Sequence, residues 1–150
     1  MYVKHLIDKV LITLEVGDVT SLFILLDKYG NIHRKGNGNA GDESQTLQMG
    51  VSHQGHFDAL MMTIDENIFH HTGVIRMPDA QGTESRLSII FNGNNGEVDL
   101  GFRVVYGSES QGPPAELVQI LINAVKITEP WYQEQLQGAA KHKEKKWWPF

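Results

Sequence analysis

The 150-residue chain contains no cysteine. This absence excludes disulfides, thiolate-bound metals, iron–sulfur clusters and cysteine nucleophiles together, and it fits a reducing compartment. No stretch approaches the ~18 consecutive apolar residues that a membrane-spanning helix needs. The opening sequence MYVKHLIDKV has no uninterrupted apolar segment followed by small residues, so no signal peptide is predicted. We therefore expect a soluble, cytoplasmic protein.

An excess of positive charge is also missing. The net charge is −5 and the pI is near 5.7, so the chain lacks the overall field that attracts nucleic acid or anionic lipid. Neither nucleic acid nor a membrane is therefore predicted as a partner. The 41% hydrophobic and 21% charged residues are ordinary for a globular protein, and the length suits one domain with one core.

The apolar pattern predicts an α+β fold. A helical stripe beginning at Val3 favours a helix over about residues 2–13, although the same segment also alternates as a strand does. Five apolar residues in a row, 22–26, predict a strand covered on both faces, followed by a turn and a second strand. A short strand at 46–51 is a further candidate.

The second half of the chain predicts helix, three strands and helix. The spacing of Phe57, Leu60, Ile64 and Ile68 predicts one unbroken helix over 57–72. The remaining elements are expected as strands near 74–77, 86–92 and 97–106, a helix opened by Pro113, and a short helix over about 129–137 that stops at Gly138. The predicted fold is one antiparallel sheet of about five strands packed with two to three helices, in the order α-ββ-α-βββ-α. Residues 1–138 would form this domain, and 139–150 a basic and aromatic C-terminal tail.

Residues 53–71, HQGHFDALMMTIDENIFHH, hold four of the seven histidines. On one continuous helix His56 and His70 would lie ~21 Å apart, too far to share a zinc ion with bonds of ~2.0–2.1 Å to nitrogen. His53 and His56 remain as a candidate metal pair, but no HExxH motif or carboxylate-rich partner accompanies them. A helix that ends in a histidine packed against the sheet, His71, explains the segment more simply.

The segment HRKGNGNAG, residues 33–41, is a candidate anion site. Consecutive glycine amides can form a concave nest, and neighbouring cations would assist it, so the candidate ligands are Arg34, Lys35, Gly36 and Gly38. The alternative is a surface loop with ordinary cations. Catalytic motifs are not evident. The segment GSESQGPP at 107–114 fits neither the phosphate-loop pattern GxxxxGK[ST] nor the nucleophile pattern GxSxG, and no pair of carboxylates stands out as an acid–base site.

These observations favour a non-enzymatic protein-binding domain without a cofactor. The partner would be another protein or a second copy, and a small bacterial immunity or regulatory protein is one form of this hypothesis. The candidate interface residues are Phe23, Leu25, Ile90 and Val105, as an apolar patch on the sheet, and Trp147 and Trp148 in the tail. The alternatives are an enzyme that uses His53 and His56, or an anion-binding module that uses the 33–41 loop.

Overall fold

The structure, a computed structural model, describes residues 3–38, 46–77, 81–109 and 111–146, with side chains described up to residue 138. Its strands are β1 (Ile7–Val16), β2 (Val19–Asp27), β3 (Asn31–Lys35), β4 (Gln48–Val51), β5 (Gly73–Arg76), β6 (Glu84–Gly93) and β7 (Val98–Gly107). Its helices are α1 (His56–Met62) and α2 (Ala115–Lys146), and its 3₁₀ turns are η1 (Lys4–Leu6), η2 (Glu66–His71) and η3 (Asn94–Gly96).

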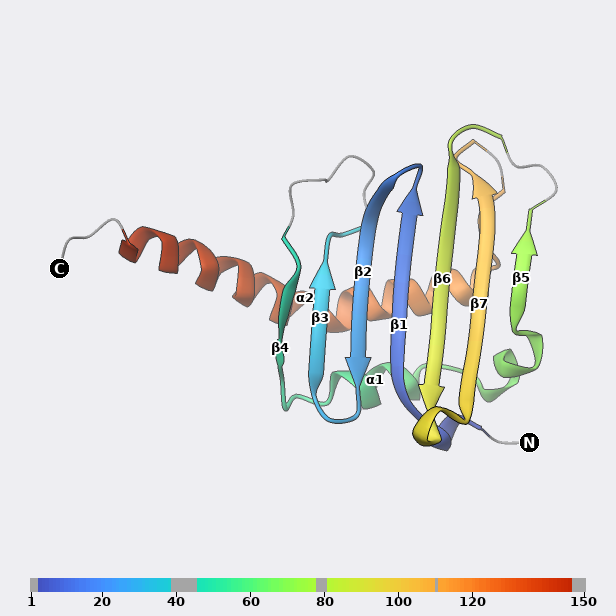
Figure 1. Cartoon of the computed structure of the whole chain (residues 1–150), viewed down its shortest axis with the longest axis horizontal. Helices are drawn as coiled ribbons and strands as arrows, with labels where there is room; N and C mark the ends of the chain where they lie inside the picture. Colours follow the sequence, from blue (N-terminus) through green and yellow to red (C-terminus); the bar gives the residue numbers. More distant parts are fainter. Residues whose placement is uncertain (1–2, 39–45, 78–80, 110, 147–150) are drawn as a thin grey trace.

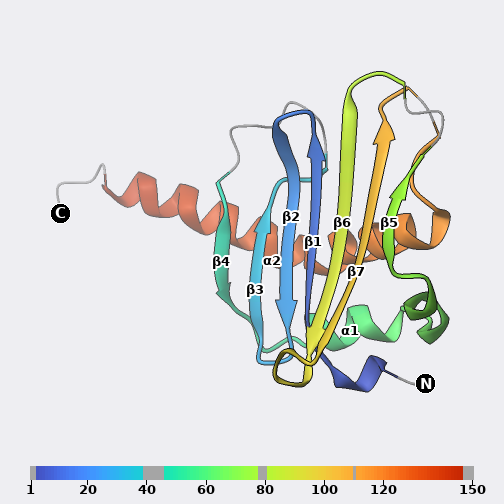
Figure 2. The same ribbon diagram turned by 45° about the vertical axis from the view of Figure 1, so that its right-hand side comes forward.

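All seven strands form one mixed sheet in the order β4-β3-β2-β1-β6-β7-β5. Neighbouring strands are antiparallel except β5, which runs parallel to β7. The expectation of an α+β fold is confirmed, but a purely antiparallel sheet of about five strands is wrong. Figures 1 and 2 show that α1 and α2 both lie against the same face of the sheet.

The core lies between that face and the two helices. Every second residue of the central strands points into it, as the period-two geometry of a strand requires. The buried apolar residues of these strands are Ile7, Val10, Ile12, Leu22, Ile24, Leu26, Leu87, Ile89, Phe91, Phe102 and Val104. The helices contribute further buried residues to this core, which are Phe57, Leu60 and Met61 of α1 and Leu117, Ile120, Ala124, Trp131 and Tyr132 of α2.

The predicted helix over 2–13 is wrong. Only Lys4–Leu6 form a helical turn, and the chain is a strand from Ile7 onward. The apolar residues of this segment fit both the helical period and the two-residue period of a strand. The neighbouring strands decide between the two, because β1 is paired on both sides, with β2 and with β6. Its Val10 and Ile12 enter the core while Leu11 points to the other face. Pairing with two strands therefore overrides the helical spacing.

The predicted continuous helix over 57–72 is also wrong. Regular helix is limited to His56–Met62, and Glu66–His71 form a separate 3₁₀ turn. Thr63 ends the first segment, since its hydroxyl donates to a carbonyl three residues earlier at 2.6 Å. Asp65 then caps the next turn, its carboxylate accepting a backbone N–H at 2.9 Å. Two residues that favour helix ends thus interrupt an otherwise helical pattern.

One helix replaces the two predicted at the C-terminal end. Helix α2 runs from Ala115 to Lys146, with Pro130 inside it and with Gly138 inside rather than after it. Proline removes one helical hydrogen bond, but the next two residues, Trp131 and Tyr132, are buried and hold the helix against the sheet. Within the described residues, no helix has the length and apolarity required to cross a lipid bilayer.

Candidate functional site

The face of the sheet opposite the helices carries a group of apolar side chains. Cross-strand pairing aligns Leu11 with Leu25 of β2 on one side and with Ile90 of β6 on the other. Directly paired residues point to the same face of a sheet. With Phe23 and Val105 on the same face, these residues define what we call the open face: Leu11, Phe23, Leu25, Ile90 and Val105. All five are partly exposed, and neither α1 nor α2 lies over them (Figures 1 and 2).

Two cations flank the open face. One row of paired residues crosses five strands in the order Lys35, Phe23, Thr13, Ser88, Arg103. Lys35 and Arg103 therefore stand at opposite ends of a row that contains Phe23. Within the described part of the chain, no carboxylate forms an ion pair with either cation.

Several other charged groups on this face have partners within the chain. Arg86 forms ion pairs with Glu15 at 2.9 Å and with Glu84 at 2.7 Å. The hydrogen bond that Arg86 donates to Glu15, followed by the one it donates to Glu84, raises the pKa of Arg86. At the other end of the same strands, Asn92 donates a hydrogen bond to Asp99 at 3.0 Å. The apolar centre is therefore bordered by polar groups, a distribution common in protein interfaces.

The structure brings four predicted interface residues together, because Phe23, Leu25, Ile90 and Val105 all lie on the open face. Trp147 and Trp148 lie outside the described residues. Sequence reasoning missed Leu11, since it treated residues 2–13 as a helix. The alternation from Val10 to Val16 was the signal that would have placed Leu11 on this face.

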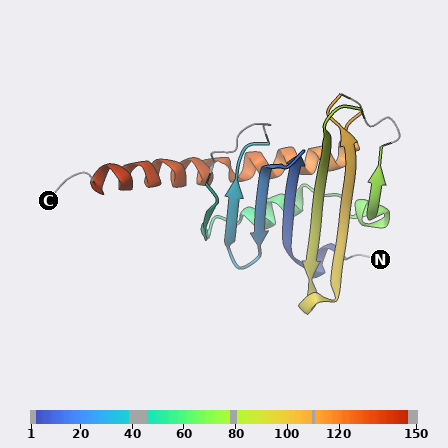
Figure 3. The same ribbon diagram turned by 45° about the horizontal axis from the view of Figure 1, so that its top comes forward.

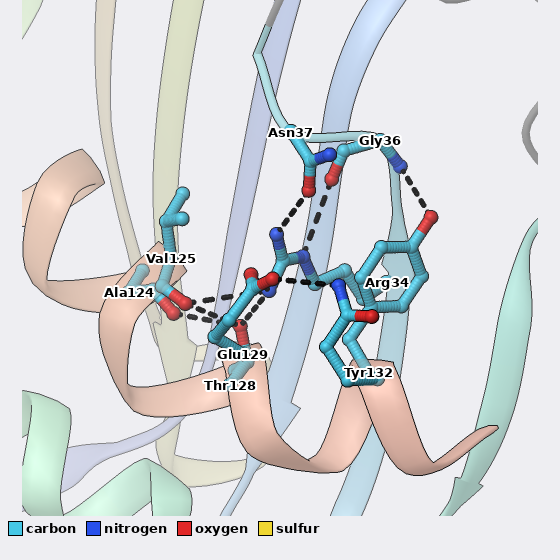
Figure 4. A network of polar contacts seen from close by, with 9 residues as sticks. Arg34, Gly36, Asn37, Ala124, Val125, Thr128, Glu129 and Tyr132 are labelled. Atoms are coloured by element: carbon cyan, nitrogen blue, oxygen red, sulfur yellow. Dashed lines mark hydrogen bonds and ion pairs between the residues drawn. The ribbon is translucent and has the colours of Figure 1, made fainter. Parts of the chain in front are cut away.

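The predicted anion-binding residues do not converge. The side chain of Arg34 points toward α2 and is completely buried, whereas the neighbouring Lys35 lies on the opposite side of the sheet. The groups around the guanidinium are the Gly36 carbonyl (3.2 Å), Asn37 Oδ1 (2.8 Å), the Val125 carbonyl (3.3 Å), Thr128 Oγ1 (3.2 Å) and the Glu129 carboxylate (2.7 Å), shown in Figure 4. The ring of Tyr132 lies against it, with Cζ 4.3 Å from the ring centroid.

The glycine amides of the predicted nest also have protein partners. Gly36 donates its N–H to the Tyr132 hydroxyl at 3.0 Å, and Gly38 donates to the Ser21 carbonyl at 2.9 Å. Gly36 has a φ of +77°, and a Cβ at this position would lie 2.3 Å from the Ser21 oxygen. Glycine is therefore required here by the close approach of the β2 backbone, and the hydrogen bond of Gly36 to Tyr132 fixes the end of β3 to α2.

The two candidate metal ligands line one surface hollow. His53 and His56 border a space of about 240 Å³ between the β2–β3 turn and the start of α1. His56 is nearly buried, and this burial lowers the pKa of its imidazole. Within the described residues, no group of three or more histidine, aspartate or glutamate side chains is arranged to hold a metal ion. The metal pair stays a prediction from the sequence.

Comparison of the chain with known protein families, with curated proteins and with solved structures found no match. Its function is therefore inferred from its own geometry. Of the three sites considered, the glycine loop is used to fix β3 to α2, and the histidine pair has no third ligand among the described residues. The open face combines apolar side chains with two cations that form no ion pair among the described residues.

Proposed function

We propose that this chain is a protein-binding domain rather than an enzyme, and that the open face is its binding surface. The observation that carries this proposal is the presence of five apolar side chains, from the four central strands, on a face without a covering helix. Antiparallel sheets with one solvated face usually alternate apolar residues inward with polar residues outward. An apolar group at the centre of the solvated face, rimmed by polar residues, is typical of an interaction site.

The charges around the open face indicate the chemistry of the partner. Lys35 and Arg103 have no ion-pair partner among the described residues, although the whole chain is acidic. Cations retained beside an apolar surface favour a partner that carries carboxylates next to apolar side chains. We propose such an acidic, apolar segment of another protein as the occupant. Immunity and regulatory proteins act by covering a partner in this manner, and the chain fits that class.

The test uses an array of short synthetic peptides with one apolar centre and three kinds of flank: acidic, basic or amide. We expect wild-type protein to bind the acidic-flanked peptides best. Leu25→Asp places a carboxylate at the centre of the open face and should weaken this binding by about tenfold or more. Lys35→Glu should weaken it less and reduce its salt dependence.

Met62→Asp is the matched control, because Met62 is an exposed apolar residue on α1, away from the open face. It should bind the acidic-flanked peptides as wild type does. Equal binding of all three flank types, or binding that survives Leu25→Asp, would contradict the proposal.

A further inference from the structure

Exposed apolar side chains gather around the edge strand β4. Among the described residues, seven large apolar side chains are exposed. Three of them lie in β4 or next to it in the chain, namely Leu47 (39% exposed), Met49 (63%) and Val51 (59%), and a fourth, Tyr29 (69%), lies in the turn between β2 and β3. The other three are spread over α1, β5 and α2. One edge of the sheet is therefore distinctly more apolar than the rest of the described surface.

The backbone of β4 is paired on one side only. Within the described ranges, β4 ends the sheet and pairs with β3 alone. Exposed edges are commonly protected against pairing with another strand by charged residues or proline. Residues 46–52, TLQMGVS, contain neither. The edge thus offers free backbone hydrogen-bonding groups beside exposed apolar side chains.

Helix α2 extends past this same edge. It passes beneath β4 at Trp131, since a Cβ at Gly50 would lie 3.1 Å from Cζ2 of that indole. The helix then continues to Lys146, and these 15 further residues span ~22 Å at 1.5 Å per residue. Figures 1 and 3 show this projecting arm beyond β4. A molecule that pairs with β4 would therefore also meet the arm.

The arm and the body of the chain carry opposite charge. Of the 13 lysines and arginines and 18 aspartates and glutamates, four lysines and two glutamates fall in the arm, residues 132–146. The arm is therefore +2, and the rest of the chain is −7, which together give the chain's −5. A basic arm that extends away from its own acidic body is complementary in charge to the body of another copy.

We propose that β4 and the projecting arm of α2 form an interface with a second copy of this chain. The two β4 strands pair antiparallel across a two-fold axis, and each basic arm lies against the acidic body of the other copy. A two-fold interface needs a self-complementary surface, and an antiparallel pair of identical edge strands provides one. The dimer goes beyond the proposed function and leaves both open faces free.

Sedimentation velocity of the full chain over a range of concentrations tests this proposal. We expect a reversible dimer that weakens as salt is raised, because salt screens the charges on the arm. The double variant Met49→Lys/Val51→Lys brings like charges together across the axis and should raise the dissociation constant by about tenfold or more. Met62→Lys, at an exposed apolar position on α1, should leave the dissociation constant unchanged.

A second variant, Lys141→Glu/Lys143→Glu/Lys145→Glu, tests the arm without altering β4, and it should also weaken the dimer. A wild-type chain that stays monomeric at all concentrations would overturn the proposal. So would a dimer that persists unchanged in the β4 double variant, or one that only Leu25→Asp dissociates. Peptide binding by the arm variant separates the two proposals, because its substitutions lie in α2 and not in the sheet, and binding should be retained if the open face binds independently of the dimer.

Discussion

At the scale of single residues, Arg34 illustrates how the same chemistry serves binding or structure. A guanidinium beside a glycine loop is typical of an anion site. Here the side chain occupies an inward position of β3, so its donors reach α2 and the chain's own loop instead. Which face of β3 is inward depends on where α2 packs. The residue type could be read from the sequence, but its role could not.

Removal of the Arg34 guanidinium should destabilise the fold. Arg34→Met would leave buried acceptors on α2 and on the loop without donors, and it would lose the contact with Tyr132. We expect the free energy of unfolding to fall by about 3 kcal/mol. Arg34→Lys should recover only a small part of this free energy, because a lysine ammonium cannot replace the planar guanidinium and its fixed N–H donors. Urea unfolding monitored by circular dichroism measures both, and a loss below about 1 kcal/mol would contradict this role.

His56 should make stability depend on pH. Burial lowers the pKa of His56 in the folded state, so the unfolded chain, with a pKa of about 6.5, takes up the proton first. Above that pH the imidazole is neutral in both the folded and the unfolded chain, so His56 causes no change of the free energy of unfolding with pH. As the pH falls below about 6.5, proton binding favours the unfolded chain, and the free energy of unfolding decreases.

The matching variant is His56→Gln, which cannot titrate. Urea unfolding at pH 7.5 and at pH 5 should show a smaller loss of stability for His56→Gln than for wild type. An equal or larger loss in the variant would mean that His56 is not responsible for this pH dependence.

At the scale of elements, the predictable strands were those whose pattern fits one period only. The alternation Val98, Leu100, Phe102, Val104, Tyr106 predicted β7, which is confirmed. The apolar run at 22–26 predicted β2; the strand is confirmed, but its expected cover on both faces is wrong, because Phe23 and Leu25 are partly exposed on the open face. In the turn between β6 and β7, Asn94 and Asn95 are both at positive φ. The prediction for the N-terminal segment failed because its apolar residues fit both the helical period and the strand period. The two strands that pair with it come later in the chain.

Adjacent residues of β2 should respond oppositely to the same substitution. Leu26 is 1% exposed and faces the helices, so Leu26→Asp buries an unpaired charge and should prevent folding. Leu25 lies on the open face, so Leu25→Asp should remain folded with a loss of about 1–2 kcal/mol. Circular dichroism and urea unfolding at neutral pH distinguish the two. Equal destabilisation would mean that the open face is covered.

At the scale of the whole molecule, the two faces and one edge of the sheet differ in which elements lie against them. One face is covered by α1 and α2 and forms the core. The opposite side of the sheet carries the five residues of the open face. The β4 edge lies beside the projecting part of α2. Strand order creates this division. Once β2, β6 and β7 are predicted as strands, the two-residue period of a strand is sufficient to group Phe23, Leu25, Ile90 and Val105, but no local pattern indicates that β4 would end the sheet.

The most direct test of the account is a titration of methyl-labelled protein with an acidic-flanked peptide from the array, followed by NMR. If the open face binds the peptide, the methyl signals of Leu11, Leu25 and Ile90 should shift most. The signals of their strand neighbours Ile12, Leu26 and Ile89, which face the core, should change little. Largest shifts among the core methyls, or around the hollow beside His53 and His56, would contradict the assignment of the open face as the binding surface.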